Sequence, residues 1–172
     1  MLVPEALGGS GRRGARLGPP HGSDVARKVR GLEAAVFDNA PMQIEALDKK
    51  DPRQYEIAVA GPAALLVAKL HKLADRASIA TRLYNKDALD VLRLLRAVST
   101  EDLSRSILRL RKEEMSASVT EEAIEFLGRD FGSDDAPGTM MCVQATQGLE
   151  NPEEIAASCA ALATDLLSAM AR

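Results

Sequence analysis

The chain has 172 residues and a mass of 18.4 kDa, which allows one ordinary domain or two small ones. It is 46% hydrophobic and 27% charged, a globular rather than a disordered composition. Only 3% of its residues are aromatic, which argues against a stacking surface for single-stranded nucleic acid. The two cysteines, Cys142 and Cys159, are too few for a disulfide scaffold and lack the clustering of a zinc site.

Charge and hydropathy place limits on location and partners. Residues 57–68 form an apolar uncharged run of 12 residues and the longest uncharged run, residues 136–149, has 14, whereas a membrane span needs about 20. Because the N-terminus also lacks a signal-peptide pattern, we expect a soluble cytoplasmic protein with no membrane association. Residues 1–30 carry six basic and two acidic side chains, while the remainder is acidic. This distribution permits local phosphate binding but gives no strong nucleic-acid footprint.

The N-terminal 60 residues predict a small β-containing region. Residues 1–7 can form only a short strand, which Pro4 confines to an edge or a strand end. Residues 8–22 are rich in glycine and proline and indicate a loop. Residues 24–37 have helical spacing of their apolar side chains, with Ser23 as the expected N-cap.

Two segments, residues 42–47 and 55–60, alternate apolar residues with others, as half-buried strands do. The segment between them has turn chemistry, which favours an antiparallel pair.

Helices are predicted throughout the rest of the chain. Ser99 or Thr100 is expected to cap the third of them, and Thr120 is a candidate cap of the fourth. The expected helices span residues 62–76, 86–98, 101–114, 119–131, 139–149 and 152–171. The sequence therefore predicts a mainly α member of the α+β class. In it, a short antiparallel sheet remnant in residues 1–60 packs on a bundle of five to six helices in residues 61–172.

One short motif suggests a nucleotide site but lacks the context for it. Residues 9–14 read Gly-Ser-Gly-Arg-Arg-Gly and match a dinucleotide-binding fingerprint. That fold needs a helix to begin there, and Gly18-Pro19-Pro20 follows instead. A basic loop is the better interpretation, in which Arg12, Arg13 and Arg16 are candidate phosphate ligands.

The residues for nucleophilic catalysis are poorly placed. His71 lies in the middle of a predicted helix and is expected to be structural. Cys142 and Cys159 lie in apolar helical stretches, where burial raises a thiol pKa and makes the thiol inert.

The most informative pattern is a set of charges on two successive helices. Lys69, Lys72 and Arg76 share one face of the first helix. Asp87 and Asp90 share a face of the second. If the two helices pack as a hairpin, a cationic stripe meets a carboxylate pair. The spacing alone favours the plainer alternative, a solvated surface of ion pairs that each contribute about 0.3–0.5 kcal/mol.

Residues 59–76 together with Lys86-Asp-Ala-Leu-Asp-Val-Leu-Arg-Leu-Leu95 resemble the AbiEii-like nucleotidyltransferases. These polymerase-beta-like enzymes include toxins of bacterial toxin–antitoxin pairs. The resemblance implies that Lys69 holds nucleotide phosphates and that Asp87 is needed for activity. It makes Lys69, Asp87 and Asp90 the candidate catalytic residues and adds Lys72 and Arg76 to the nucleotide-binding set.

The chain departs from this family at the metal site. Nucleotidyl transfer uses Mg²⁺ ions, which bind carboxylate oxygens. The family supplies these from an acid-x-acid pair after Gly-Ser, and no two of the 25 acidic residues here are separated by one residue. No metal ligands are therefore predicted. We expect a protein that is inactive alone, with Mg²⁺ and a nucleoside triphosphate relevant only if a catalytic lobe, lost or separately encoded, is supplied.

Other functions remain open at the level of sequence. A non-catalytic helical interaction or oligomerisation module would use the small residues of Ile155–Ala163 for close helix packing. As a component of a toxin–antitoxin system, the chain would bind an antitoxin. Nucleotide or phosphate binding without catalysis would use Lys69 and the arginine-containing loop.

Overall fold

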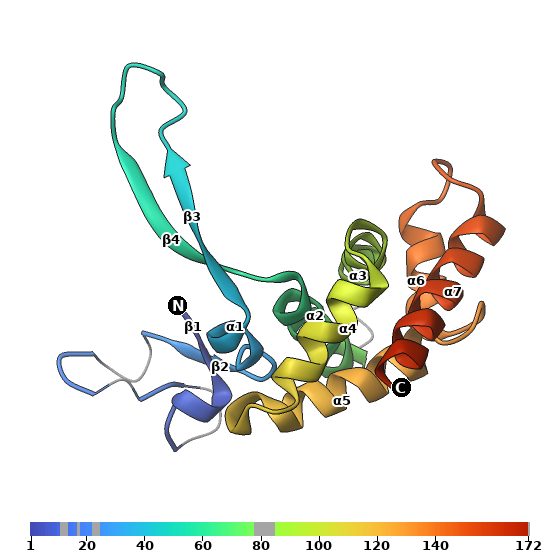
Figure 1. Cartoon of the computed structure of the whole chain (residues 1–172), viewed down its shortest axis with the longest axis horizontal. Helices are drawn as coiled ribbons and strands as arrows, with labels where there is room; N and C mark the ends of the chain where they lie inside the picture. The colour runs from blue at the N-terminus through green and yellow to red at the C-terminus, as the bar shows by residue number, and fades with distance from the viewer. Residues whose placement is uncertain (11–13, 17, 22–24, 78–84, 172) are drawn as a thin grey trace.

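The computed structural model describes residues 1–10, 14–16, 18–21, 25–77 and 85–171. It is mainly helical with two small sheets, which confirms the predicted α+β class. A helical body (residues 62–170) lies beside an N-terminal segment (residues 1–38), and a two-stranded arm (residues 39–60) projects away from both (Figure 1). Among the described residues, no helix is both long and apolar enough to cross a membrane.

The N-terminal segment contains a short parallel pair of strands. β1 (Leu2–Pro4) pairs with β2 (Arg27–Val29), and the 3-10 helix η1 (Glu5–Leu7) follows β1. The short first strand is thus confirmed. The described residues between 8 and 21 form no helix, as expected from the glycine and proline content.

The helix predicted over residues 24–37 is wrong for most of its length. Residues 27–29 form β2, and only α1 (Ala34–Phe37) is helical. Gly31, between β2 and α1, has φ +92°. A right-handed helix cannot continue through a residue in this left-handed conformation. The proposed cap Ser23 lies outside the described residues.

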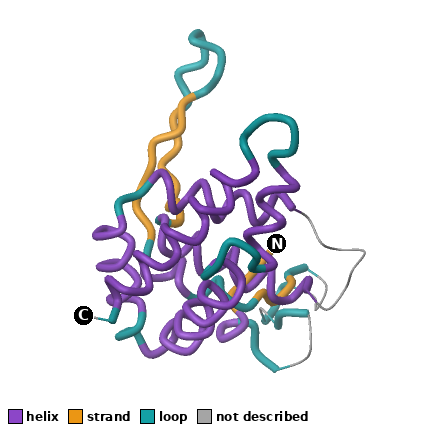
Figure 2. The backbone as a smooth tube through the Cα atoms, turned by 90° about the vertical axis from the view of Figure 1, so that its right-hand side faces the viewer, coloured by secondary structure: helices purple, strands orange, loops and turns teal. Residues whose placement is uncertain are grey.

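The predicted antiparallel pair is present but does not lie on the core. β3 (Asn39–Glu45) pairs with β4 (Gln54–Ala60), with Met42 opposite Ile57. β3 is exposed along its whole length, and β4 is partly buried only at its last two residues. The expectation of half-buried strands is therefore wrong, because the alternating apolar face of this pair is exposed among the described residues. Figure 2 shows the two strands leaving the body together.

The helical body consists of α2 (Pro62–Ala77), α3 (Asn85–Ala97), α4 (Thr100–Leu110), α5 (Glu114–Phe131), α6 (Pro137–Ala145) and α7 (Pro152–Met170). Ser99 caps α4 by accepting a hydrogen bond from the backbone N–H of Asp102, as predicted. Thr120 is not a cap, because α5 begins six residues earlier. Its buried hydroxyl donates to the carbonyl of Ser116 within the helix.

One apolar core joins these helices. Its largest fully buried side chains include Phe131 of α5 and several leucines of α2, α3 and α4. Ile155, Cys159 and Ala163 of α7 also belong to it, so the small residues of this helix serve packing within the chain. Ala34 of α1 lies in the same core and anchors the N-terminal segment.

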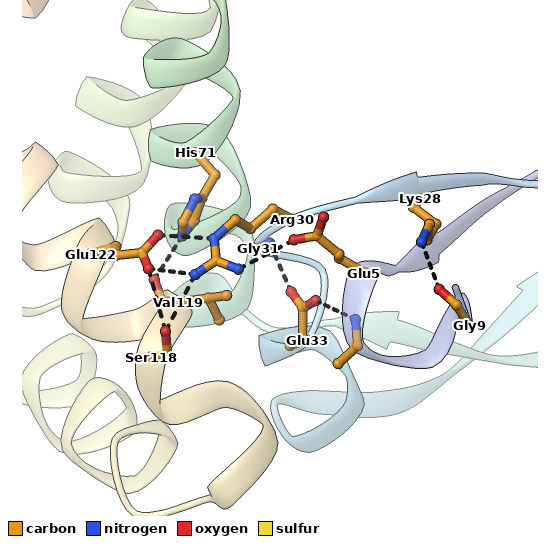
Figure 3. Close-up of polar contacts among 11 residues, drawn as sticks. Glu5, Gly9, Lys28, Arg30, Gly31, Glu33, His71, Ser118, Val119 and Glu122 are labelled. Atoms are coloured by element: carbon orange, nitrogen blue, oxygen red, sulfur yellow. Dashed lines mark hydrogen bonds and ion pairs between the residues drawn. The ribbon is translucent and has the colours of Figure 1, made fainter. Parts of the chain in front are cut away.

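Ionic contacts fasten the N-terminal segment to α5 (Figure 3). The guanidinium of Arg30 pairs with both carboxylate oxygens of Glu122, and it also bonds to Glu5 and Ser118. The buried carboxylate of Glu33 accepts hydrogen bonds from the backbone N–H groups of Ala6 and Gly31. Arg30 thus attaches the N-terminal segment to α5, and Glu33 holds the segment itself together.

Candidate functional site: a charge cluster between α2 and α3

The charged residues singled out in the sequence lie where α2 packs against α3. On α2, Leu66, Leu70 and Leu73 are buried in the core. Lys69, Lys72 and Arg76 lie on a different face of the helix, since they follow one another at intervals of three and four residues. This face meets the carboxylates of α3. The expected meeting of a cationic stripe with a carboxylate pair is therefore found.

Asp87 is the centre of the cluster. Its Oδ1 lies 2.7 Å from Nζ of Lys72 and 3.3 Å from Nζ of Lys69. Its Oδ2 accepts a hydrogen bond from Nη1 of Arg76 at 2.7 Å. The Asp87 side chain is only 1% exposed, so a fully solvated surface of ion pairs is the wrong description for this residue.

Asp90 extends the cluster toward solvent. Its Oδ2 lies 2.6 Å from Nζ of Lys69, and its Oδ1 lies 3.2 Å from Nη1 of Arg93. Lys69 thus bridges the two carboxylates. Arg93 is 67% exposed, so its ion pair contributes little to stability.

The electrostatics favour the charged forms of Asp87, Asp90 and Lys69. Burial alone would raise the pKa of Asp87, but hydrogen bonds and charge from Lys72 and Lys69 outweigh it and lower that pKa. The hydrogen bond from Lys69 lowers the pKa of Asp90. Partial burial opposes the charge of Lys69, yet its contacts with Asp90 and Asp87 raise its pKa. At neutral pH these groups are charged, and the two carboxylates are poor proton acceptors.

The charge count gives the cluster a chemical preference. In the contacts between described residues of α2 and α3, four cationic side chains surround two carboxylates, and each lysine ammonium has three N–H donors. The side chains of Lys69 and Lys72 are 27% and 38% exposed, so both are partly open to solvent. An excess of positive charge held at fixed positions favours a multiply charged anion such as a phosphate chain.

The same geometry does not fit Mg²⁺. Both carboxylates are already bound by lysine or arginine, which compete with a cation for the same oxygens. In the described part of the chain, no group of three or more His, Cys, Asp or Glu side chains could hold a metal ion. No step of a metal-dependent transfer follows from these residues.

The arginines of the N-terminal loop are not brought to this cluster. Arg12 and Arg13 lie outside the described residues. Arg16 lies in the N-terminal segment, which Figure 1 places on the opposite side of α2 from α3. Its backbone N–H donates to the carbonyl of Gly8.

The remaining nucleophile candidates are buried in the core. Nε2 of His71 lies 2.7 Å from the carbonyl oxygen of Val119, and its ring meets Phe126 edge-on. These contacts explain His71 as a structural residue. A hydrogen bond with Cys159 and burial raise the pKa of the Cys142 thiol, so it is not a reactive thiolate.

Sequence reasoning missed Asp38, which positions α2. Its Oδ2 accepts a hydrogen bond from the backbone N–H of Ala64 at 2.9 Å, in the first turn of that helix. Its Oδ1 lies 3.4 Å from Nη2 of Arg109. Asp38 precedes the arm and Pro62 follows it, so 23 residues separate the cap from its helix and no local capping pattern could reveal it.

Comparison with known proteins gives no relative: no family model, curated protein or solved structure matches this chain.

Proposed function

We propose that the α2–α3 charge cluster binds the phosphate groups of a nucleotide. The chain would then be the helical part of a nucleotidyltransferase-like protein, and it would not transfer nucleotides by itself. The observation that carries the proposal is the buried carboxylate of Asp87, which holds Lys69, Lys72 and Arg76 together.

The roles follow from exposure and contact. Asp87 is a positioning residue, because it is buried and acts through the cations it holds. Lys72 is the most exposed of the three cations on α2 and is expected to provide the largest direct contribution to phosphate binding. The sequence resemblance to AbiEii-like enzymes supports the same site, since it identifies Lys69 and Asp87 independently of these contacts.

Isothermal calorimetry with a nucleoside triphosphate at low ionic strength tests the proposal. We expect binding in the micromolar to millimolar range that weakens as salt is added, because the attraction is largely between exposed charges. Lys72→Ala should weaken binding at least about fivefold, equivalent to about 1 kcal/mol. Lys50→Ala, a lysine in the exposed turn of the arm, is the control and should bind as the unmodified chain does.

A second assay addresses catalysis. The purified chain incubated with Mg²⁺ and labelled nucleoside triphosphates should transfer no label to RNA or protein. Robust transfer that is lost in the Asp87→Asn variant would contradict the proposed inactivity. Equal binding by Lys72→Ala and the unmodified chain would contradict the proposed site.

A further inference from the structure

The two cysteines of the chain meet inside the helical core. Cys142 of α6 and Cys159 of α7 are both fully buried. The two helices pack against each other (Figure 1), and a side-chain hydrogen bond joins the two thiols. The turn between α6 and α7 separates these residues in the sequence, so the fold creates a pair that their spacing does not reveal.

The two thiols of the pair are not equivalent. The Cys142 thiol donates the hydrogen bond and the Cys159 sulfur accepts it, which raises the pKa of Cys142 and lowers the pKa of Cys159. Burial alone would raise the pKa of Cys159, but the hydrogen bond outweighs it. The positive charge of Arg96 on α3 favours a thiolate at both positions. Cys142 therefore keeps its proton, and Cys159 is the better nucleophile.

Thr139 places a further donor beside the pair. It lies one turn before Cys142 on α6 and is fully buried. Its hydroxyl has no hydrogen-bond partner of ordinary geometry among the described residues, and it lies near the Cys159 sulfur, where it favours the thiolate. A buried donor without a partner costs free energy, and a charged sulfur would relieve that cost by accepting the bond. The surroundings of Cys159 thus suit a thiolate better than a neutral thiol.

Two sulfurs alone do not make a metal site at this position. Structural zinc takes four protein ligands, and no group of three or more His, Cys, Asp or Glu side chains in the described ranges could hold a metal ion. Two neighbouring thiols can instead react with each other, because a disulfide requires two sulfurs that can approach closely.

We propose that Cys142 and Cys159 form a reversible intrachain disulfide, with a small-molecule disulfide such as oxidised glutathione as the oxidant. The Cys159 thiolate attacks one sulfur of the oxidant, which forms a mixed disulfide and releases a glutathione thiolate. That thiolate takes the proton of Cys142. The Cys142 sulfur then attacks Cys159, which closes the intrachain bond and releases the second glutathione. The pair gives up two electrons and two protons, and the oxidant becomes two glutathione molecules.

The oxidant reaches the pair through local opening, because both sulfurs are buried. α6 has only nine residues and lies between two exposed segments, residues 132–135 and 147–150. A short element of this kind opens at a lower free energy than the whole domain. The disulfide ties α6 to α7 and closes this route, so oxidation locks the two helices together.

Equilibration of the whole chain in glutathione buffers of graded composition, followed by acid quenching and intact-mass measurement, tests the proposal. The folded chain should lose two hydrogen atoms and retain no glutathione. Half-oxidation should require a value of [GSH]²/[GSSG] at least about tenfold higher in the folded chain than in urea, because the fold holds the sulfurs together. Cys142→Ala removes the second sulfur and should retain one glutathione on Cys159.

Thr139→Val tests the environment of Cys159, since it removes the hydroxyl and keeps the shape of the side chain. The ultraviolet absorbance of the thiolate in the reduced chain should titrate at least about half a pH unit higher than in the unmodified chain. Thr120→Val is the matched control, because its buried hydroxyl donates to the carbonyl of Ser116 within α5, and it should leave the titration unchanged. Circular dichroism establishes that each variant is folded.

Three results would overturn the inference. They are a folded chain that stays reduced in buffers that oxidise the unfolded chain, a disulfide that the fold does not favour over the unfolded chain, and disulfide-linked dimers in place of the intrachain bond. An equal thiolate titration in Thr139→Val and the unmodified chain would remove the role of the hydroxyl. These measurements contain no nucleotide, so their outcome is independent of the proposed phosphate site.

Discussion

At the scale of single residues, Asp87 shows what sequence can and cannot reveal. The spacing of Lys69, Lys72 and Arg76 and of the two aspartates predicted the meeting of the two faces, because helical periodicity fixes which side chains share a face. It did not predict that Asp87 is almost fully buried while Asp90 is 34% exposed. That difference depends on how α3 lies against α2. The spacing of residues along a single helix does not determine this packing.

Replacing Asp87 by Asn should destabilise the chain by about 1–3 kcal/mol, because three cations lose their shared carboxylate. The cost is below that of a fully buried pair since the cations are partly solvated. The pKa of Asp87 is lower in the folded chain, so its contribution is present above about pH 4 and is lost as pH falls through the folded pKa. Urea unfolding from pH 7 to pH 2 measures this, and the stability difference between the two proteins should shrink in acid. A constant difference down to pH 2 would contradict the role assigned to the charge.

Gly31 occupies a position that we expect no other residue to fill without a loss of stability. It has φ +92°, and a Cβ atom there would lie 2.7 Å from Cδ2 of His71. Gly31→Ala should therefore lower the free energy of unfolding by about 1–3 kcal/mol, since both backbone strain and a clash with a buried ring result. Denaturant unfolding measures the change. Gly18→Ala is the control for positive φ without a clash, because a Cβ atom at that position would have no neighbour within 4 Å. An equal cost in both variants would show that the contact with His71 is unimportant.

At the scale of elements, the helices were the most predictable part of the chain. The apolar periodicity of residues 62–76 and 86–98 lies within one residue of the bounds of α2 and α3 at each end. Residues 24–37 had the same periodicity, yet Gly31 and the pairing of β2 with β1 overrode it. The start of α5 was misplaced because Thr120 looks like a cap in sequence but bonds within a helix that has already begun.

Asp38 is expected to stabilise the start of α2. Asp38→Ala should cost about 1–2 kcal/mol of stability, because the first turn of α2 loses a side-chain acceptor and a negative charge at its N-terminus. Thermal and urea unfolding measure the loss. Arg109→Ala removes only the ion pair, which is 3.4 Å long and 58% exposed on the arginine side, and should cost much less. Equal losses in the two variants would assign the effect to the ion pair instead of the cap.

At the scale of the whole molecule, the arm stands apart from the helical body. The predicted domain boundary at residue 60 stays a prediction. Ala34, which precedes that boundary, lies in the core of the helices, whereas the arm stands apart from it. The period-two pattern of the strands predicted their pairing correctly. It could not show whether another layer of the same chain covers the apolar face, because that depends on the path of the chain beyond the hairpin.

Removing the arm tests this separation. The backbone N–H of Gly61 donates to the carbonyl of Asp38 at 2.8 Å, so the two ends of the arm are adjacent. Replacing residues 41–58 by an Asn-Gly turn should change the thermal midpoint by less than about 4 °C, because no core side chain is lost. Differential scanning calorimetry measures the midpoint. A much larger decrease would show that the arm stabilises the body.

Phosphate binding by the α2–α3 cluster should be visible residue by residue in solution. Backbone amide NMR during a titration with a nucleoside triphosphate locates a binding site directly. We predict saturable shifts at Lys69–Arg76 and Asp87–Arg93, with the tip of the arm unchanged and with the shifts reduced in the Lys72→Ala variant. No shift in these two segments at millimolar ligand, or saturable shifts confined to other parts of the chain, would contradict it.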